Sequence, residues 1–113
     1  QISRVAAKLT SVPEGHGTML DHTLIVYLSD AAEKHHGSCT EWPFLLLGGL
    51  GQAKAGSGRY LQFPSYGKKG QRTIGNLYNT FMEYAGKPQD QFGRLDLNID
   101  VELQRGPLPE LIS

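Results

Sequence analysis

The sequence has little of several features that would mark a protein class. Cysteine occurs once among 113 residues, as Cys39, which excludes an internal disulfide and a zinc site built from several cysteines. The 11 basic and 11 acidic residues cancel, and no basic cluster exceeds Lys68-Lys69, so the charge pattern of a nucleic-acid-binding protein is missing. The longest apolar run, around Phe44–Leu47, is far too short to span a membrane. We therefore expect neither a nucleic-acid partner nor a membrane partner.

The N-terminus lacks a basic segment followed by a long apolar one, so no export signal is visible. The length supports one domain with a single hydrophobic core, and we expect residues 1–113 to form it. The 14 glycines are concentrated between Gly48 and Gly75, where they alternate with aromatic and branched residues. This mixture indicates tight loops rather than disorder.

Apolar periodicity predicts two helices. The first carries apolar residues at helical spacing, namely Ile2, Val5, Ala6 and Leu9, and Pro13 ends it. The second spans Thr73 to Ala85, where Thr73 is a candidate N-cap and Gly86 with Pro88 stops the helix. Beyond Phe92 periodic signals are few, and Gly106–Pro109 is expected to be an extended tail on the surface.

Three segments are predicted to be strands. Thr23–Ser29 is a continuous β-branched and aliphatic run, which is typical of a strand covered on both faces, as in a parallel sheet. Phe44–Leu47 gives a second short buried strand closed by Gly48-Gly49, and Arg59–Phe63 alternates like an edge strand. The fold class predicted is therefore α/β, with a small, mainly parallel sheet flanked by the two helices.

The candidate site lies where the first strand ends. Asp30 follows that strand, and His35 and His36 come five and six residues later, with Glu33 between. Ligands of open α/β sheets bind at the carboxyl ends of strands, and carboxylate with imidazole suits zinc, manganese or iron. Adjacent histidines in an extended chain point to opposite sides, so one metal would use one of them more easily than both. The alternative is a solvated loop that caps the strand, because no compact motif such as H-E-x-x-H is present.

Other residues allow weaker hypotheses. Cys39 lies three and four residues after the histidines, and a nearby imidazolium would favour a reactive thiolate. Its alternative is a small buried residue beside Trp42, the commoner fate of a free cysteine. Arg59 and Tyr60, and later Lys68 and Lys69, could meet an anionic substrate or could simply be solvated surface residues.

Several segments, taken in order, resemble a known family. They are P-E-G-H-G-T-M-L-D-H-T-L-I-V-Y-L-S-D (Pro13 to Asp30), His35-His36, E-W-P-F-L-L-L-G-G (Glu41 to Gly49), G-R-Y-L (Gly58 to Leu61), N-L-Y (Asn76 to Tyr78), Phe92-Gly93 and G-P-L-P-E-L (Gly106 to Leu111). The series is similar to the C-terminal part of bacterial proteins named for an H-x-x-S-H-H motif, a branch that resembles the alkaline phosphatase and sulfatase superfamily. The similarity runs over nearly all of the chain.

The resemblance implies an α/β/α sandwich, usually exported to the periplasm or the cell exterior, whose metal-dependent relatives hydrolyse phosphate or sulfate esters. In those relatives a strand ending in Ser-Asp-His supplies two metal ligands. Ser29-Asp30 matches the first two letters, but the third is Ala31. The resemblance therefore implies a divalent metal (zinc, manganese or calcium) bound by Asp30, with the histidine ligand either taken from His35 or His36 or lost.

The superfamily's nucleophile and earlier metal ligands would lie upstream of Gln1. The resemblance thus implies the C-terminal portion of a larger domain, which as this chain alone is not a competent esterase. An unpaired sheet edge tends to be covered, so the expected partner is another copy of the chain, in a homo-oligomer, or the missing N-terminal half. The alternative function is a non-catalytic binding or structural module that self-associates.

Overall fold

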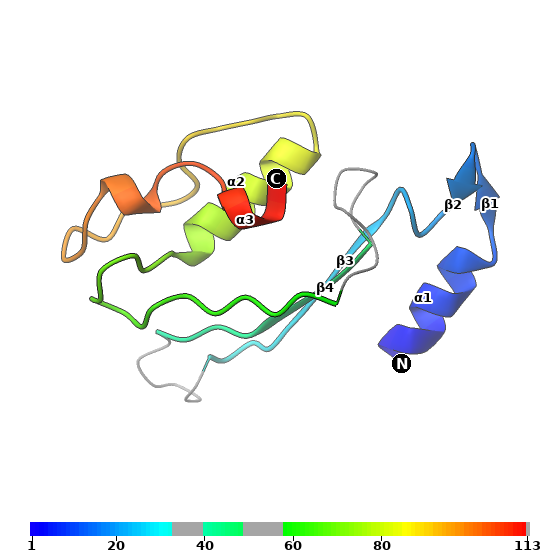
Figure 1. Cartoon of the computed structure of the whole chain (residues 1–113), viewed down its shortest axis with the longest axis horizontal. Coiled ribbons are helices and arrows are strands. Elements are labelled where there is room, and N and C mark those ends of the chain that lie inside the picture. Colours follow the sequence, from blue (N-terminus) through cyan, green and yellow to red (C-terminus); the bar gives the residue numbers. More distant parts are fainter. Residues whose placement is uncertain (33–39, 49–57, 113) are drawn as a thin grey trace. The chain divides into compact units, whose positions relative to one another are not determined.

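The structure, a computed structural model, describes residues 1–32, 40–48 and 58–112. Its contacts divide the chain into two compact units (Figure 1). Unit 1 comprises Gln1–Leu28 and Phe44–Gly58, and unit 2 comprises Ser29–Pro43 and Arg59–Ser113. Each unit is described by itself.

Unit 1 begins with helix α1, which spans Ile2–Thr10 and confirms the helix predicted from the apolar stripe. The helix ends at Ser11, whose N–H donates to the carbonyl oxygens of Ala7 and Lys8. None of its residues is buried, and Val5 on the apolar stripe is exposed. The helix is therefore amphipathic without a fully covered apolar face.

A small hairpin follows α1. Strand β1 (Pro13–Glu14) pairs antiparallel with β2 (Gly17–Thr18). The Asp21 carboxylate holds the hairpin end, because its Oδ2 accepts from the Thr18 backbone N–H at 2.7 Å and from the Thr18 hydroxyl at 2.9 Å. His22 Nδ1 lies 2.9 Å from Glu14 Oε2. Side chains outside the two strands thus fix this turn.

The two apolar segments form strands, but their direction contradicts the predicted fold class. Strand β3 (Leu24–Leu28) pairs antiparallel with β4 (Phe44–Gly48), in a register that sets Val26 opposite Leu46. The described strands make two separate two-stranded antiparallel sheets, so the mainly parallel sheet flanked by helices was wrong. A continuous apolar run reports which faces of a strand avoid water, and it carries no information about the direction of its neighbour.

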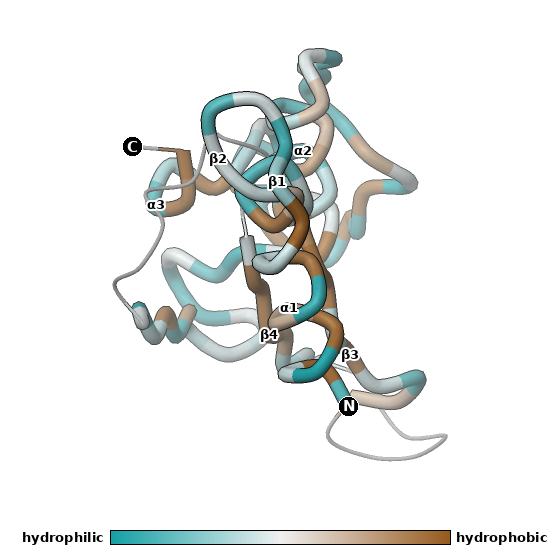
Figure 2. The backbone as a smooth tube through the Cα atoms, turned by 90° about the vertical axis from the view of Figure 1, so that its right-hand side faces the viewer, coloured by the Kyte–Doolittle hydropathy of each residue, from teal (hydrophilic) through white to brown (hydrophobic). Residues whose placement is uncertain are grey.

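Unit 1 leaves this ribbon of β3 and β4 largely uncovered. Nine of its ten residues are apolar side chains on both faces, Gly48 being the exception, and Figure 2 shows both strands mostly in the hydrophobic colour. Tyr27 and Leu45 face each other across the ribbon and are 57% and 48% exposed. No described residue of unit 1 is buried. The ribbon therefore has the apolar composition of a buried element, although none of its residues is buried.

Unit 2 is organised around helix α2, which spans Ile74–Tyr84 and confirms the predicted helix. Thr73 caps it as expected: its side chain accepts from the Asn76 N–H, and the Asn76 side chain accepts from the Thr73 N–H at 2.9 Å. This reciprocal capping box satisfies two backbone donors that would otherwise be left over at the helix start. The sequence carries Asn where the usual motif has Glu or Gln.

The core of unit 2 is unusually polar. Its fully covered residues include Asn76, Asn79 and Thr80, and buried apolar contacts come from Leu77, Tyr84 and Leu108. The polar side chains bind the backbone of the segment 105–108, which follows the short 3-10 helix η1 (Glu102–Gln104). Leu108 is only 4% exposed and leads into helix α3 (Pro109–Ile112). The predicted extended surface tail was therefore wrong.

The segment 59–63 is not assigned as a strand, contrary to the predicted edge strand. Arg59 Nη1 donates instead to the carbonyl oxygen of Glu110 at 2.9 Å, which ties the start of this segment to α3. Alternation alone did not distinguish an extended segment from a paired strand.

Gly48 at the end of β4 tests the register of the ribbon. Its φ is +79°, and an added Cβ would collide with the carbonyl oxygen of Thr23. Gly48→Ala should therefore lower the free energy of unfolding by roughly 1–3 kcal/mol through backbone strain, and by a further amount because the Thr23 carbonyl has to move. Urea denaturation measures the loss. Gly67→Ala is the control, because its φ is +75° with nothing near the added Cβ; equal losses in both variants would contradict the close approach.

Candidate functional site

Asp30 lies two residues beyond the end of β3, in unit 2. Its backbone turns there, since Ala31 N–H donates to Ser29 Oγ at 3.2 Å and the Ser29 hydroxyl donates to Asp30 Oδ1 at 3.5 Å. The Asp30 residue is exposed, and within the described chain it makes no ion pair. A carboxylate in this setting is available to a cation from solution.

The other predicted donors cannot be set beside Asp30. Glu33, His35 and His36 lie outside the described residues, and so does Cys39, the residue of the separate thiolate hypothesis. Among the residues that the structure does describe, no group of three or more His, Cys, Asp or Glu side chains is placed to hold a metal ion. The imidazole ligand predicted for Asp30 therefore stays a prediction.

The chemistry of Asp30 fits a divalent ion as one ligand of several. Carboxylate oxygens bind zinc, manganese and calcium. A structural or catalytic zinc takes at least three protein ligands and calcium takes six to eight oxygens. Asp30 thus offers an oxygen donor of the kind that these ions bind. The remaining ligands would have to come from other residues, among them those that follow Asp30 in the sequence.

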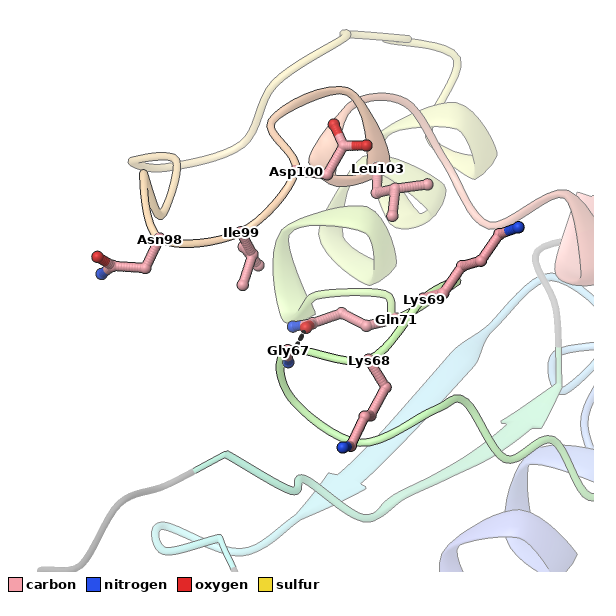
Figure 3. A pocket seen from close by; sticks show the side chains of 8 residues that line it. All are labelled: Gly67, Lys68, Lys69, Gln71, Asn98, Ile99, Asp100 and Leu103. Atoms are coloured by element: carbon pink, nitrogen blue, oxygen red, sulfur yellow. Dashed lines mark hydrogen bonds between the residues drawn. The ribbon is translucent and has the colours of Figure 1, made fainter.

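A first hollow in unit 2 contains the lysines considered for anion binding (Figure 3). Its volume is about 290 Å³, and the loop at Gly67–Lys69 faces η1 and the residues before it. In Figure 3 the Lys68 and Lys69 side chains extend in different directions, and Asp100 places a carboxylate on the same hollow. The two ammonium groups do not converge on one anion, so this hollow gives the anionic-substrate hypothesis little support.

A second hollow of about 380 Å³ lies at the start of α2. Tyr78 and Phe92 line it with stacked rings whose centroids lie 4.7 Å apart. Ile74, Leu95 and Arg94 also line it. Sequence reasoning assigned no binding role to these residues, because Phe92 and Leu95 lie in a stretch without periodicity.

A hydrogen-bonded cluster beside both hollows was also missed. The Tyr66 hydroxyl donates to Asp96 Oδ2 at 2.6 Å, and Asp96 Oδ1 accepts from the backbone and side-chain nitrogens of Asn98, each at 2.9 Å. Gln104 is buried and brackets the backbone of Asp96, donating to its carbonyl and accepting from its N–H, both at 2.8 Å. The cluster fixes the loop that joins the two hollows.

The cluster shifts two acid–base equilibria. The hydrogen bond from Tyr66, and then the backbone N–H of Asn98, lower the pKa of Asp96. The same hydrogen bond to Asp96 raises the pKa of Tyr66. Asp96 therefore adds stability above its ordinary pKa, which is lost as pH falls through its folded pKa. The contribution of Tyr66 is present below its ordinary pKa and is lost as pH rises through its raised value.

Removing the Tyr66 hydroxyl should release the Asp96 carboxylate. In Tyr66→Phe the pKa of Asp96 is expected to rise towards its ordinary value, because the strongest donor to the charged form is gone. An NMR titration of the Asp96 carboxyl carbon measures this change. Tyr60→Phe is the matched control, since Tyr60 is 84% exposed. An unchanged Asp96 titration in Tyr66→Phe would contradict the assigned cause.

Among the described residues, no helix has the length and apolar character needed to cross a membrane. The chain matches no protein-family model, no curated protein and no solved structure. The resemblance to the H-x-x-S-H-H family therefore stays a prediction from the sequence, and function has to be argued from the residues of this chain.

Proposed function

We propose that this chain contributes Asp30 as a divalent-metal ligand within an alkaline phosphatase-like or sulfatase-like protein, and that it does not hydrolyse esters by itself. The supporting observation is the exposed Asp30 carboxylate directly after β3, without an ion pair in the described chain. His35 and His36 follow within six residues, and one of them supplies the second ligand. We also propose that the protein is exported from the cytoplasm, as the family resemblance implies.

The roles of the residues follow from their chemistry. Asp30 supplies a negative oxygen donor, and one imidazole of His35 or His36 supplies a neutral nitrogen donor. Ser29 donates to Asp30 Oδ1 and so limits the rotation of the carboxylate that would hold the ion. A metal bound there would polarise a phosphate or sulfate ester or lower the pKa of a water. The nucleophile and the remaining ligands come from outside this chain.

Asp30→Ala tests the metal proposal. The purified chain, dialysed against zinc or manganese, should retain stoichiometric metal by elemental analysis, and the variant should fall to background because the anionic ligand is lost. Glu83→Ala is the control: it removes an exposed carboxylate from the surface of α2 and should leave the metal content unchanged. Metal that binds equally to all three chains, or to none, would rule out Asp30 as a ligand.

A second candidate function is a non-catalytic module that self-associates, and the β3–β4 ribbon favours it. Both faces of the ribbon are apolar, its Tyr27, Leu28 and Leu45 side chains are exposed, and its unit has no buried residue among those described. A two-stranded sheet is only marginally stable in water unless further strands or a helix cover it. A second copy of the chain can provide that cover.

Light scattering at micromolar concentration tests self-association. The wild-type chain should have a multiple of the monomer mass, and Tyr27→Lys should be monomeric, because a charge replaces an exposed aromatic ring on the ribbon. Tyr60→Lys makes the same exchange at an exposed tyrosine of unit 2 and should behave as wild type. A strictly monomeric wild-type chain would contradict this candidate.

A further inference from the structure

The outer edge of β3 is an unpaired row of backbone groups in unit 1. Within the described chain, β3 pairs only with β4, along its whole length from Leu24 to Leu28. The N–H and C=O groups that point away from β4 therefore have no strand partner in this unit. Such an edge is a template for another strand.

The two edges of the ribbon differ in what they offer. β4 is preceded by Pro43, which has no N–H to donate, and it ends at Gly48 with φ +79°. β3 contains neither proline nor glycine. It also carries Tyr27 and Leu28, two of the three exposed apolar side chains of the ribbon. The edge of β3 is thus the better template and has more to gain from a neighbour.

The sequence of β3 is compatible with antiparallel pairing to itself. A two-fold axis at Val26 sets Leu24 opposite Leu28 and Ile25 opposite Tyr27 of the second copy, and each pair occurs twice. The exposed Tyr27 ring then gains a β-branched cross-strand neighbour, a pairing worth roughly 0.2–1 kcal/mol. No charge lies within β3, so no like charges meet.

We propose that two copies of the chain join through the edge of β3, with the two-fold axis at Val26, to form one four-stranded antiparallel sheet in the order β4-β3-β3-β4. This inference rests on the proposed self-association and assigns its surface and register. A closed two-fold contact is the commonest arrangement of homo-oligomers. The pairing doubles the ribbon to a number of strands that can be stable in water.

Disulfide trapping tests the register. In a Cys39→Ser background, Val26→Cys places one thiol from each copy on the axis, where opposed Cα atoms are about 4.5–5.5 Å apart. Leu46→Cys is the matched control, because Leu46 is the cross-strand partner of Val26 on β4. In the proposed sheet the two Leu46 positions are three strand spacings apart, roughly 14 Å, and a disulfide spans at most about 7 Å. Val26→Cys should therefore form a covalent dimer on mild oxidation, and Leu46→Cys should not.

The outcomes separate this inference from the proposal beneath it. A monomeric wild-type chain in light scattering would overturn both. The β3 register alone would be overturned if the wild-type chain is oligomeric but the Leu46→Cys variant crosslinks, or if neither cysteine variant crosslinks. A mixture of Ile25→Cys and Tyr27→Cys chains gives an independent check should Val26→Cys fail to fold: the mixed dimer should form, and each variant alone should stay uncrosslinked.

Discussion

The buried side chain of Asn76 is the interaction on which unit 2 depends. Its amide oxygen accepts from the Thr73 N–H and so closes the start of α2, while its amide nitrogen donates to the carbonyl oxygens of Arg105 and Gly106, each at 3.0 Å. Asn79 adds a second donor to Gly106, and the Thr80 hydroxyl accepts from the Leu108 N–H at 2.8 Å. One face of α2 thus substitutes for a strand, satisfying the backbone of a segment that has no regular partner.

Unit 1 follows the opposite logic. Its ribbon satisfies backbone groups between β3 and β4, but its side chains find no interior. A buried hydrogen bond contributes a net stabilisation of about 1 kcal/mol, and an uncovered apolar side chain contributes little until something covers it. Unit 2 is therefore held together by contacts that the chain makes with itself. In unit 1 the apolar side chains of the ribbon remain partly exposed to water. The proposed metal ligand Asp30 follows directly after this ribbon.

Local signals in the sequence were sufficient for the helices. The stripe from Ile2 to Leu9 and the Thr73 cap both gave helices with nearly the expected bounds. The two apolar runs gave strands but not their direction, because burial periodicity is blind to pairing. The C-terminal segment was misjudged because its anchors, Asn76 and Thr80, lie about 30 positions away and appear in the sequence as ordinary polar residues of a helix. For the candidate site, the position of Asp30 after a strand was readable, and its partners depend on contacts outside the described residues.

The link between α2 and the segment at Arg105–Leu108 also sets an order of events during synthesis. The polar face of α2 leaves the ribosome well before the carbonyl and N–H groups that it binds. Until those residues emerge, the amide nitrogen of Asn76 lacks the two carbonyl oxygens to which it donates in the folded unit, and the Thr80 hydroxyl lacks the Leu108 N–H. Unit 2 should thus acquire its core late, as one event, and a nascent chain that pauses before Arg105 would carry a helix without the segment that makes it native.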